Sequence, residues 1–233
     1  MGPPYIINTS QGNRLYSKQI KFIQINLHHS RLATNNLMKI IDEERTDVLF
    51  LQEPYVIHNK IAGIPTRLNI YASGEGRHRA AIVTNNQIDF LLLIQLSDED
   101  TVVLEAVSDK GKIIIASMYF DINRHIEYDL NKIEAIIKHA KGAGILLAID
   151  SNSRSISWHD IQTNSIGRIL EEFLLSKHLH LMNEESNLTT FLNSRGSSNI
   201  DLTVINNHLL RAVQHWKSVT KKAVLITVSS NLQ

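Results

Sequence analysis

Residues 142–150, GAGILLAID, form the stretch that most constrains the fold, because a glycine-bounded apolar run ends there in a carboxylate. Residues 47–54, DVLFLQEP, show the same pattern earlier in the chain, with Glu53 after a continuous apolar run and Pro54 behind it. Continuous apolar runs of this length are typical of strands that are buried on both faces. We therefore predict two buried strands, each bringing an acidic side chain to a shared cleft.

Helical and strand patterns alternate outward from these two runs. A strand is predicted over 20–27, and helices over 31–44, 126–140 and 166–176, where apolar residues recur at helical spacing. Further short strands are predicted in the segments AAIVT, DFLLLIQL, VVLEAVS, KIIIASMYF, HLHLMN, TTFL, NIDLTVIN and AVLITVS. Since neither a linker nor a repeat divides the chain, we predict one α+β domain in which two packed sheets are flanked by helices.

The composition excludes several classes of protein. The 233 residues include 24 Lys plus Arg, 23 Asp plus Glu and no cysteine. A disulfide framework, a thiolate zinc site and a cysteine nucleophile are therefore excluded, and the longest apolar runs are too short to cross a bilayer. Residues 186–233 carry five Lys or Arg against one Asp, a net charge of +4. This part of the chain could face phosphates, and a solvated basic surface without a partner is the alternative.

Five oxygen-bearing side chains stand at or just beyond the ends of predicted strands: Asn26, Glu53, Asp150, Asn152 and Asp201. Any one of them alone is better explained as a turn former or a helix cap. Together they form an oxygen-rich set, and hard oxygen ligands select Mg²⁺ or Mn²⁺ over zinc. A divalent ion held by one or two carboxylates is what phosphate-ester hydrolysis requires.

Ordered motifs then identify a family. QINLHHSRLAT begins at Gln24, LQEP at Leu51, SMYFD at Ser117, IDSNSRSISWH at Ile149 and TTFLNSRGSSNIDLTVIN at Thr189. Over about residues 20–222 the chain resembles the apurinic-endonuclease-like domain of insect non-LTR retrotransposons. It therefore also resembles the wider exonuclease/endonuclease/phosphatase superfamily, which includes deoxyribonuclease I and exonuclease III. The resemblance implies the deoxyribonuclease I-like fold, a four-layer αββα sandwich.

The resemblance also implies roles for the strand-end residues. Asn26 would sit beside the metal, Mg²⁺ or alternatively Mn²⁺, and Glu53 would be its principal ligand. Tyr119 would contact the scissile phosphate. Asp150 would orient or deprotonate the attacking water, and Asn152 would stabilise the charge that builds on the phosphorane. These roles suit the residue types, because Tyr and Asn are neutral donors and a buried Asp is a credible base.

Asp201 would normally orient a histidine that this chain lacks. In the family a Ser-Asp-His triplet and a closing strand end the domain, whereas this chain reads KKAVLITVSSNLQ after the basic segment. We therefore expect a tail at 1–19 and a domain at 20–233 that is truncated or frameshifted after about 222, with the last strand missing. A one-base frameshift within the codons of Val224, Leu225, Ile226 and Thr227 could restore the triplet.

Four further positions are candidate DNA contacts: Arg154, Ser155, Thr190 and Arg195. The turn over 74–79, GEGRHR, is another. For Arg154, Arg195 and this turn a solvated surface is about as good an explanation. Thr190 precedes a predicted strand, and a structural role explains it equally well.

The resemblance implies an Mg²⁺-dependent DNA endonuclease domain. It would nick one strand of double-stranded DNA and leave a 3'-hydroxyl that primes reverse transcription by a downstream reverse transcriptase domain. Such a domain would be an intracellular monomer, nuclear at its point of action, with no membrane partner. Because the Ser-Asp-His motif is absent, a catalytically silent DNA-binding remnant is one alternative. A phosphoesterase of the same superfamily that acts on a small phosphate ester is the other.

Overall fold

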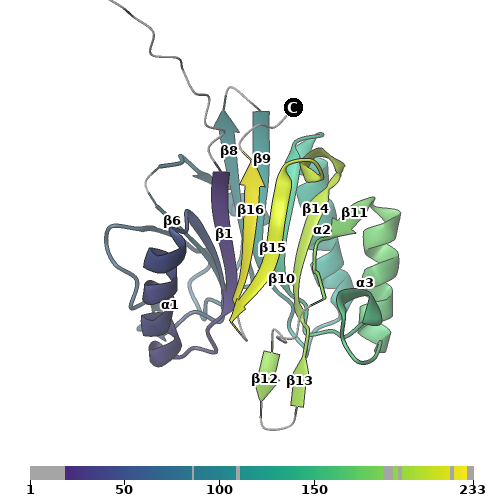
Figure 1. The fold of residues 1–233 in the computed structure, drawn as a ribbon, viewed down its shortest axis with the longest axis horizontal. Helices are drawn as coiled ribbons and strands as arrows, with labels where there is room; N and C mark the ends of the chain where they lie inside the picture. The colour runs from purple at the N-terminus through teal and green to yellow at the C-terminus, as the bar shows by residue number, and fades with distance from the viewer. Residues whose placement is uncertain are drawn as a thin grey trace, which may run out of the picture.

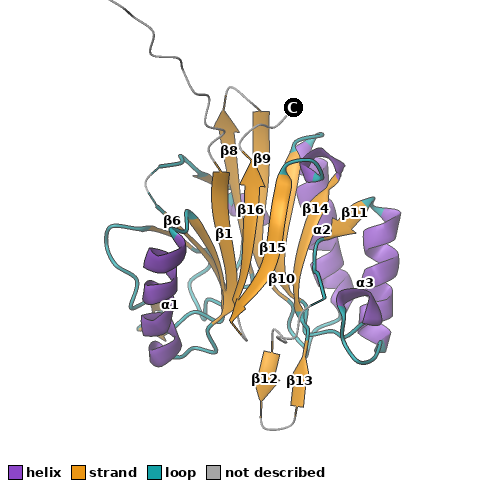
Figure 2. Ribbon diagram, in the orientation of Figure 1, coloured by secondary structure: helices purple, strands orange, loops and turns teal. Residues whose placement is uncertain are grey.

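The computed structural model describes residues 19–85, 87–108, 111–185, 191–193, 196–220 and 223–229. Two six-stranded sheets pack face to face in this part of the chain. Helix α1 (Arg31–Glu44) lies on the outer side of one sheet, and α2 (Ile126–Ala140) and α3 (Ser165–Ser176) lie on the outer side of the other (Figures 1 and 2). The predicted α+β fold, with four αββα layers, is confirmed.

The strands of each sheet are ordered as follows. The sheet on the α1 side has the order β15 (Val213–Thr220), β16 (Ala223–Ser229), β1 (Gln19–Asn26), β2 (Val48–Gln52), β6 (Ala80–Thr84), β5 (Asn69–Tyr71). The sheet on the α2 and α3 side has the order β11 (Leu179–Leu181), β14 (Asp201–Asn206), β10 (Gly144–Asp150), β9 (Gly111–Tyr119), β8 (Thr101–Ser108), β7 (Leu91–Leu92). Two small hairpins pair β3 (Val56–Ile57) with β4 (Lys60–Ile61), and β12 (Phe191–Asn193) with β13 (Gly196–Ser198).

Three apolar layers hold the four structural layers together. Ile23 of β1 packs with Leu37 of α1, whereas Phe22, one residue earlier, faces the second sheet and stacks on Phe50 at a ring-centroid distance of 5.8 Å. A third cluster lies between the second sheet and helices α2 and α3. Apolar residues therefore line both faces of the central strands, as the continuous apolar runs predicted.

The directions of the strands bring the polar residues at their ends to the same side of the molecule. β1 runs parallel to β2, and β9 runs parallel to β10. The carboxyl ends of all four strands lie at the lower end of the molecule in Figure 1, from which the β12–β13 hairpin also extends. Loops that follow parallel strands are a common place for a site.

Two predictions for secondary structure were wrong. DFLLLIQL does not form one strand, because only Leu91–Leu92 pairs with β8 and the chain then turns into a short 3₁₀ helix over Ile94–Leu96. The final strand is not missing either. Residues Ala223–Ser229 form β16, which lies between β15 and β1 and is buried along its whole length.

Two further 3₁₀ segments, Ile156–Trp158 and Asn207–Leu209, complete the described elements. Among the described helices, none has the length and apolar character needed to cross a membrane.

Candidate active site

Strand register brings three predicted residues together in the second sheet. In the parallel β9–β10 pair Tyr119 lies opposite Asp150, and in the antiparallel β10–β14 pair Asp201 lies opposite Asp150. Asp150 and Asp201 expose only 1% and 3% of their surface. Because directly opposed residues on adjacent strands project to the same face, the three side chains form a row across the end of this sheet.

A hydrogen bond joins this row to the first sheet. The Asn26 Nδ2 group at the end of β1 donates to Asp150 Oδ2 at 2.6 Å. The Asn26 Oδ1 atom accepts the backbone N–H of His28 at 2.8 Å. Both ends of the Asn26 carboxamide are therefore engaged, and the residue fixes the Asp150 carboxylate across the junction of the two sheets.

Glu53 follows the last residue of β2 and turns out of the strand. Its backbone is left-handed, with φ of 46°, and its N–H donates to the Arg79 carbonyl at 2.8 Å. His28 Nδ1 lies 3.2 Å and His29 Nε2 lies 3.5 Å from the carboxylate oxygens of Glu53. The hydrogen bond from His28 lowers the pKa of Glu53, although partial burial opposes the shift. Glu53 is therefore an ionised carboxylate with 18% of its side chain exposed.

Four of the ten described non-glycine residues with positive φ lie at this place. His28, His29, Glu53 and Asn152 all have φ between 46° and 53°. A left-handed conformation costs a residue with a Cβ roughly 1–2 kcal/mol, and Asn tolerates it best. Four such residues around one cluster of polar side chains are characteristic of a functional site.

Asp150 has the opposite electrostatic environment from Glu53. Burial raises the pKa of Asp150 to about 6, and the nearby Glu53 charge adds to this effect, while hydrogen bonds from Asn26 and Asn152 oppose it. Its Oδ1 atom accepts the backbone N–H of Asn152 at 3.3 Å. A carboxylate that titrates near neutral pH can take up a proton in a reaction more readily than an ordinary one.

Tyr119 and Asn152 supply neutral donors on the other side of Asp150. Burial, together with the charges of Glu53 and Asp150, raises the pKa of Tyr119 to about 12, so its hydroxyl keeps its proton at neutral pH. Asn152 Nδ2 donates one N–H to the Phe120 carbonyl at 2.8 Å. This hydrogen bond orients the carboxamide, and a second side-chain hydrogen bond, between Asn152 and Tyr119, opposes the rise in the pKa of Tyr119.

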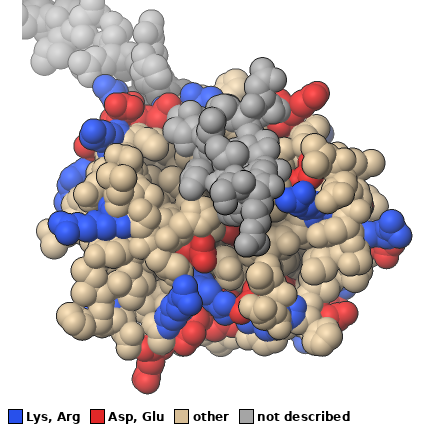
Figure 3. Space-filling view, turned by 90° about the horizontal axis from the view of Figure 1, so that it is seen from below, with Lys and Arg blue, Asp and Glu red and all other residues tan. Residues whose placement is uncertain are grey.

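Charged side chains of both signs surround this end of the molecule. Figure 3 looks onto the face from below, where Asp and Glu atoms are visible near the middle and Lys or Arg groups lie directly beside acidic ones. Such a face fits a site that holds a cation and also approaches a polyanion.

The other predicted contacts have different outcomes. Ser155 is wrong as a DNA contact: it is fully buried, and its hydroxyl bonds to Glu171 and Thr163 within the fold. The cause is local, because the loop folds back onto α3 so closely that a Cβ on Gly167 would lie 2.0 Å from the Arg154 carbonyl. The Arg154 side chain is half-buried and stays a prediction. Thr190 and Arg195 lie outside the described residues, as do 1–18 of the predicted tail.

Sequence reasoning missed the surroundings of Tyr119. The predicted DNA contact Arg79 instead pairs with Asp100 and Asp121, and its guanidinium covers the Tyr119 ring at 5.1 Å from the ring centroid. The only signal in the sequence was that the segments LSDED and YFD place acidic residues next to strand ends. Nothing in that pattern indicates which arginine they bind.

The donor set fits a hard divalent cation. Among the described residues there is no group of three or more His, Cys, Asp or Glu side chains arranged to hold a metal. Mg²⁺ does not need such a cage, since it keeps several waters and binds one or two carboxylates. Glu53, which is ionised and partly exposed, meets this requirement. Asp150 lies close enough for the charge of Glu53 to raise its pKa.

Comparison with known proteins places these features in a family context. Residues 113–224 match the family model described as endonuclease-reverse transcriptase. The chain is 25% identical over 206 residues to the putative 115 kDa protein in type-1 retrotransposable element R1DM of Drosophila melanogaster. It is 24% identical over 172 residues to the retrovirus-related Pol polyprotein from type-1 retrotransposable element R1 of Bradysia coprophila. These matches cover 84% and 69% of the chain, but only 20% and 17% of the two relatives, so the chain spans about a fifth of their length.

Solved structures share the fold. The endonuclease domain of TRAS1, a telomere-specific non-LTR retrotransposon, superimposes with a TM-score of 0.82 at 23% identity and covers 92% of this chain and 100% of its own. The AP endonuclease LMAP of Leishmania major has a TM-score of 0.70 at 12% identity and covers 97% of this chain and 92% of its own.

Proposed function

Because this chain has the endonuclease/exonuclease/phosphatase fold and resembles R1-type retrotransposon proteins in sequence, we propose that it is a metal-dependent DNA endonuclease domain of a non-LTR retrotransposon. The observation that supports this most directly is the junction of the two sheets. There a buried carboxylate, Asp150, meets the ionised Glu53 and the neutral donors Tyr119 and Asn152.

Glu53, which is ionised and partly exposed, would hold the ion. Asn26, predicted as a second ligand, contributes by fixing Asp150, since its carboxamide is engaged at both ends. A bound Mg²⁺ or Mn²⁺ would polarise a phosphoryl oxygen and screen the charge on the leaving alkoxide.

The protein groups divide the remaining work. Asp150, held by Asn26, accepts the proton of the water that attacks phosphorus, and its pKa of about 6 keeps it ionised at pH 7 to 8. The Tyr119 hydroxyl and the carboxamide N–H of Asn152 donate to the phosphoryl oxygens as negative charge builds on them. Cleavage of the bond to the 3' oxygen releases a 3'-hydroxyl.

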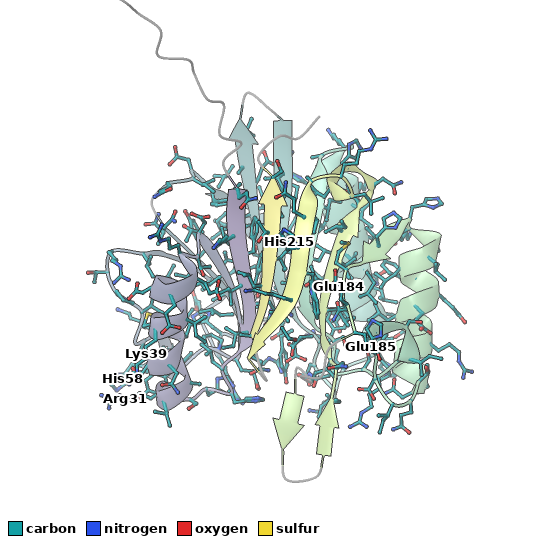
Figure 4. The ribbon with its side chains drawn as sticks, viewed as in Figure 1. Arg31, Lys39, His58, Glu184, Glu185 and His215 are labelled. Atoms are coloured by element: carbon teal, nitrogen blue, oxygen red, sulfur yellow. The ribbon has the colours of Figure 1, made fainter. Side chains whose placement is uncertain are left out.

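Basic side chains on and beside α1 suit a DNA substrate. Arg31 is the first residue of α1, and Figure 4 shows Arg31, Lys39 and His58 together beside the lower part of this helix. All three are exposed. The positive charges of Arg31 and Lys39 would supply phosphate contacts of the kind on which DNA affinity depends.

The biological role follows from the relatives. A nick with a free 3'-hydroxyl can prime reverse transcription, and the relatives are retrotransposon proteins of which the matched segments make up only 20% and 17%. The domain would then act as a monomer on double-stranded DNA in the nucleus, with a reverse transcriptase supplied by the same element.

A plasmid-nicking assay tests the proposal. Supercoiled plasmid is incubated with the chain and Mg²⁺, beside an EDTA control and the Asp150→Ala variant. Conversion to open circles that is lost in both controls supports the proposed function. Salt-sensitive DNA binding without nicking contradicts it and identifies a silent remnant, the outcome that the missing Ser-Asp-His motif would produce.

A further inference from the structure

Arg79 connects the two halves of the site although it lies outside the strand-end set. It precedes β6, and its backbone carbonyl accepts the N–H of Glu53 at 2.8 Å. Its side chain extends toward the second sheet, where Nε and Nη2 donate to the two carboxylate oxygens of Asp100 at 2.5 and 2.7 Å. A further N–H donates to Asp121. The same residue therefore contacts the backbone of Glu53 and carboxylates on both sides of Tyr119.

The guanidinium of Arg79 lies over the ring of Tyr119, with Cζ 5.1 Å from the ring centroid. Asp100 fixes both partners, because its carboxylate binds the guanidinium and its backbone carbonyl accepts the Tyr119 N–H at 2.8 Å. A two-pronged ion pair holds a guanidinium in one plane, and a cation over an aromatic face is attracted to it. One face of the Tyr119 ring is thus covered by a group that cannot rotate freely.

Arg79 has little capacity left for a phosphate. Although burial disfavours its charge, Asp100 and Asp121 more than offset that effect and raise the pKa of Arg79 above its usual value. Three of its five N–H groups are used in these pairs. Its charge is therefore balanced within the fold, which argues against the DNA contact predicted for this turn.

A second arginine provides a matched comparison. Arg124 donates to the same Asp100 at 2.8 Å and to Asp129 at 2.6 Å. It also covers a tyrosine ring, that of Tyr128, at 4.1 Å from the centroid. Tyr128 is on α2 and is not part of the strand-end row. The two arginines therefore share an ion-pair partner and a stacking mode, and only one of them covers a ring in the site.

We infer that Arg79 is a positioning residue that fixes the Tyr119 ring so that its hydroxyl points to the scissile phosphate. The part about the phosphate rests on the proposed function, whereas the part about the order of the ring does not. Removing it should let the ring rotate or shift within the site. A displacement of about 1 Å in a reacting group can lower the rate by about 100-fold.

Ring order can be measured without any activity. The protein is labelled with carbon-13 at the Cζ position of its six tyrosines, and the Tyr119 and Tyr128 signals are identified from the Tyr119→Phe and Tyr128→Phe spectra. We expect Arg79→Met to shift or broaden the Tyr119 signal and to leave the Tyr128 signal in place. Arg124→Met should do the reverse. An unchanged Tyr119 signal in Arg79→Met overturns the inference.

Arg79→Lys is the second variant, in case Arg79→Met does not fold. It keeps a cation for Asp100 and Asp121 but removes the planar group that covers the ring. We expect the same change in the Tyr119 signal, and an unchanged signal again overturns the inference.

Nicking kinetics then test whether the order of the ring matters. Arg79→Met should lower kcat by about 10- to 100-fold with KM changed by less than about threefold, and Arg124→Met should change neither by more than about threefold. In a Tyr119→Phe background, which lacks the hydroxyl, Arg79→Met should cost less than about twofold. Equal losses in both backgrounds mean that Arg79 does not act through the Tyr119 hydroxyl, and so contradict the inference.

Failure of this inference can be told from failure of the proposed function. If the wild-type chain does not nick DNA, the proposed function fails, and the tyrosine spectra still decide whether Arg79 fixes the ring. If the wild type nicks DNA and Arg79→Met nicks it equally well, only the inference about Arg79 fails.

Discussion

Strands β2 and β10 both end near the junction of the two sheets, and each places a carboxylate there, Glu53 after β2 and Asp150 at the end of β10. The two strand ends nevertheless have different local structures. β2 ends at Gln52, and the left-handed turn at Glu53 puts its side chain at the rim, beside two histidines and partly in solvent. Asp150 is still within the ladder of β10, paired on both sides and 1% exposed. As a result the pKa of Glu53 is lowered, whereas that of Asp150 is raised to about 6.

Under the proposed function, this difference suits the two carboxylates to different tasks. A cation needs a reachable oxygen that keeps its charge, and Glu53 provides it. A proton acceptor works best with a pKa near the working pH and in a fixed orientation, and Asp150 provides both. Pairs of titratable groups whose environments push their pKa values apart are a recognised mark of acid–base assignment.

The largest effect is expected at Asp150. Asp150→Asn keeps the shape and the hydrogen bond to Asn26 but cannot accept a proton, so kcat for plasmid nicking should fall by at least about 1000-fold. Raising the Mg²⁺ concentration should not restore it. A loss below about tenfold, measured under single-turnover conditions, would show that Asp150 is not the base.

Glu53→Gln should behave differently in the same assay. Its defect should appear as an increase of about 10- to 100-fold in the Mg²⁺ concentration needed for half-maximal nicking, because a neutral amide is a weaker ligand. Thermal unfolding gives an independent measure, since Mg²⁺ should raise the Tm of the wild type more than that of the variant. Equal Mg²⁺ dependence of the two proteins contradicts the assignment of Glu53 as the ligand.

The sequence predicted this contrast only in part. Both carboxylates were predicted from a local feature, namely an apolar run followed by an acid. The fold followed from the same runs together with the helical periodicities. The pairing of Arg79 with Asp100 and Asp121 was not predictable, since it joins residues 21 and 42 positions apart that lie in different loops. Ser155 was misjudged for the same reason, because only the packing of its loop on α3 shows that it is buried.

In the metal-free protein, ionisation of Asp150 and of Glu53 should change the free energy of unfolding in opposite directions. The folded pKa of Asp150 lies above its ordinary value of 3.8, so its contribution favours the folded state below about pH 4 and is lost as the pH rises through about 6. Asp150→Asn removes this loss and should raise the free energy of unfolding at pH 8 by about 1–3 kcal/mol. Urea unfolding in EDTA at pH 5 and pH 8 measures it, and a variant less stable than the wild type at pH 8 contradicts the expectation.

The smallest effect is expected at His28, and it should have the opposite sign. The folded pKa of Glu53 lies below its ordinary value of 4.5, mainly because of the hydrogen bond from His28, so its contribution is present above pH 4.5 and is lost as the pH falls through the folded value. His28→Ala should therefore destabilise the metal-free protein at pH 7, but by less than about 1 kcal/mol, since the pair is partly solvated. The difference should shrink as the pH falls through the folded pKa of Glu53. A destabilisation that stays the same as the pH is lowered would mean that His28 acts through packing, and the low pKa of Glu53 would then need another cause. At neutral pH we expect Asp150→Asn to stabilise the fold and His28→Ala to destabilise it. Urea titrations of the two variants together therefore test whether burial makes the ionised Asp150 unfavourable while His28 makes the ionised Glu53 favourable.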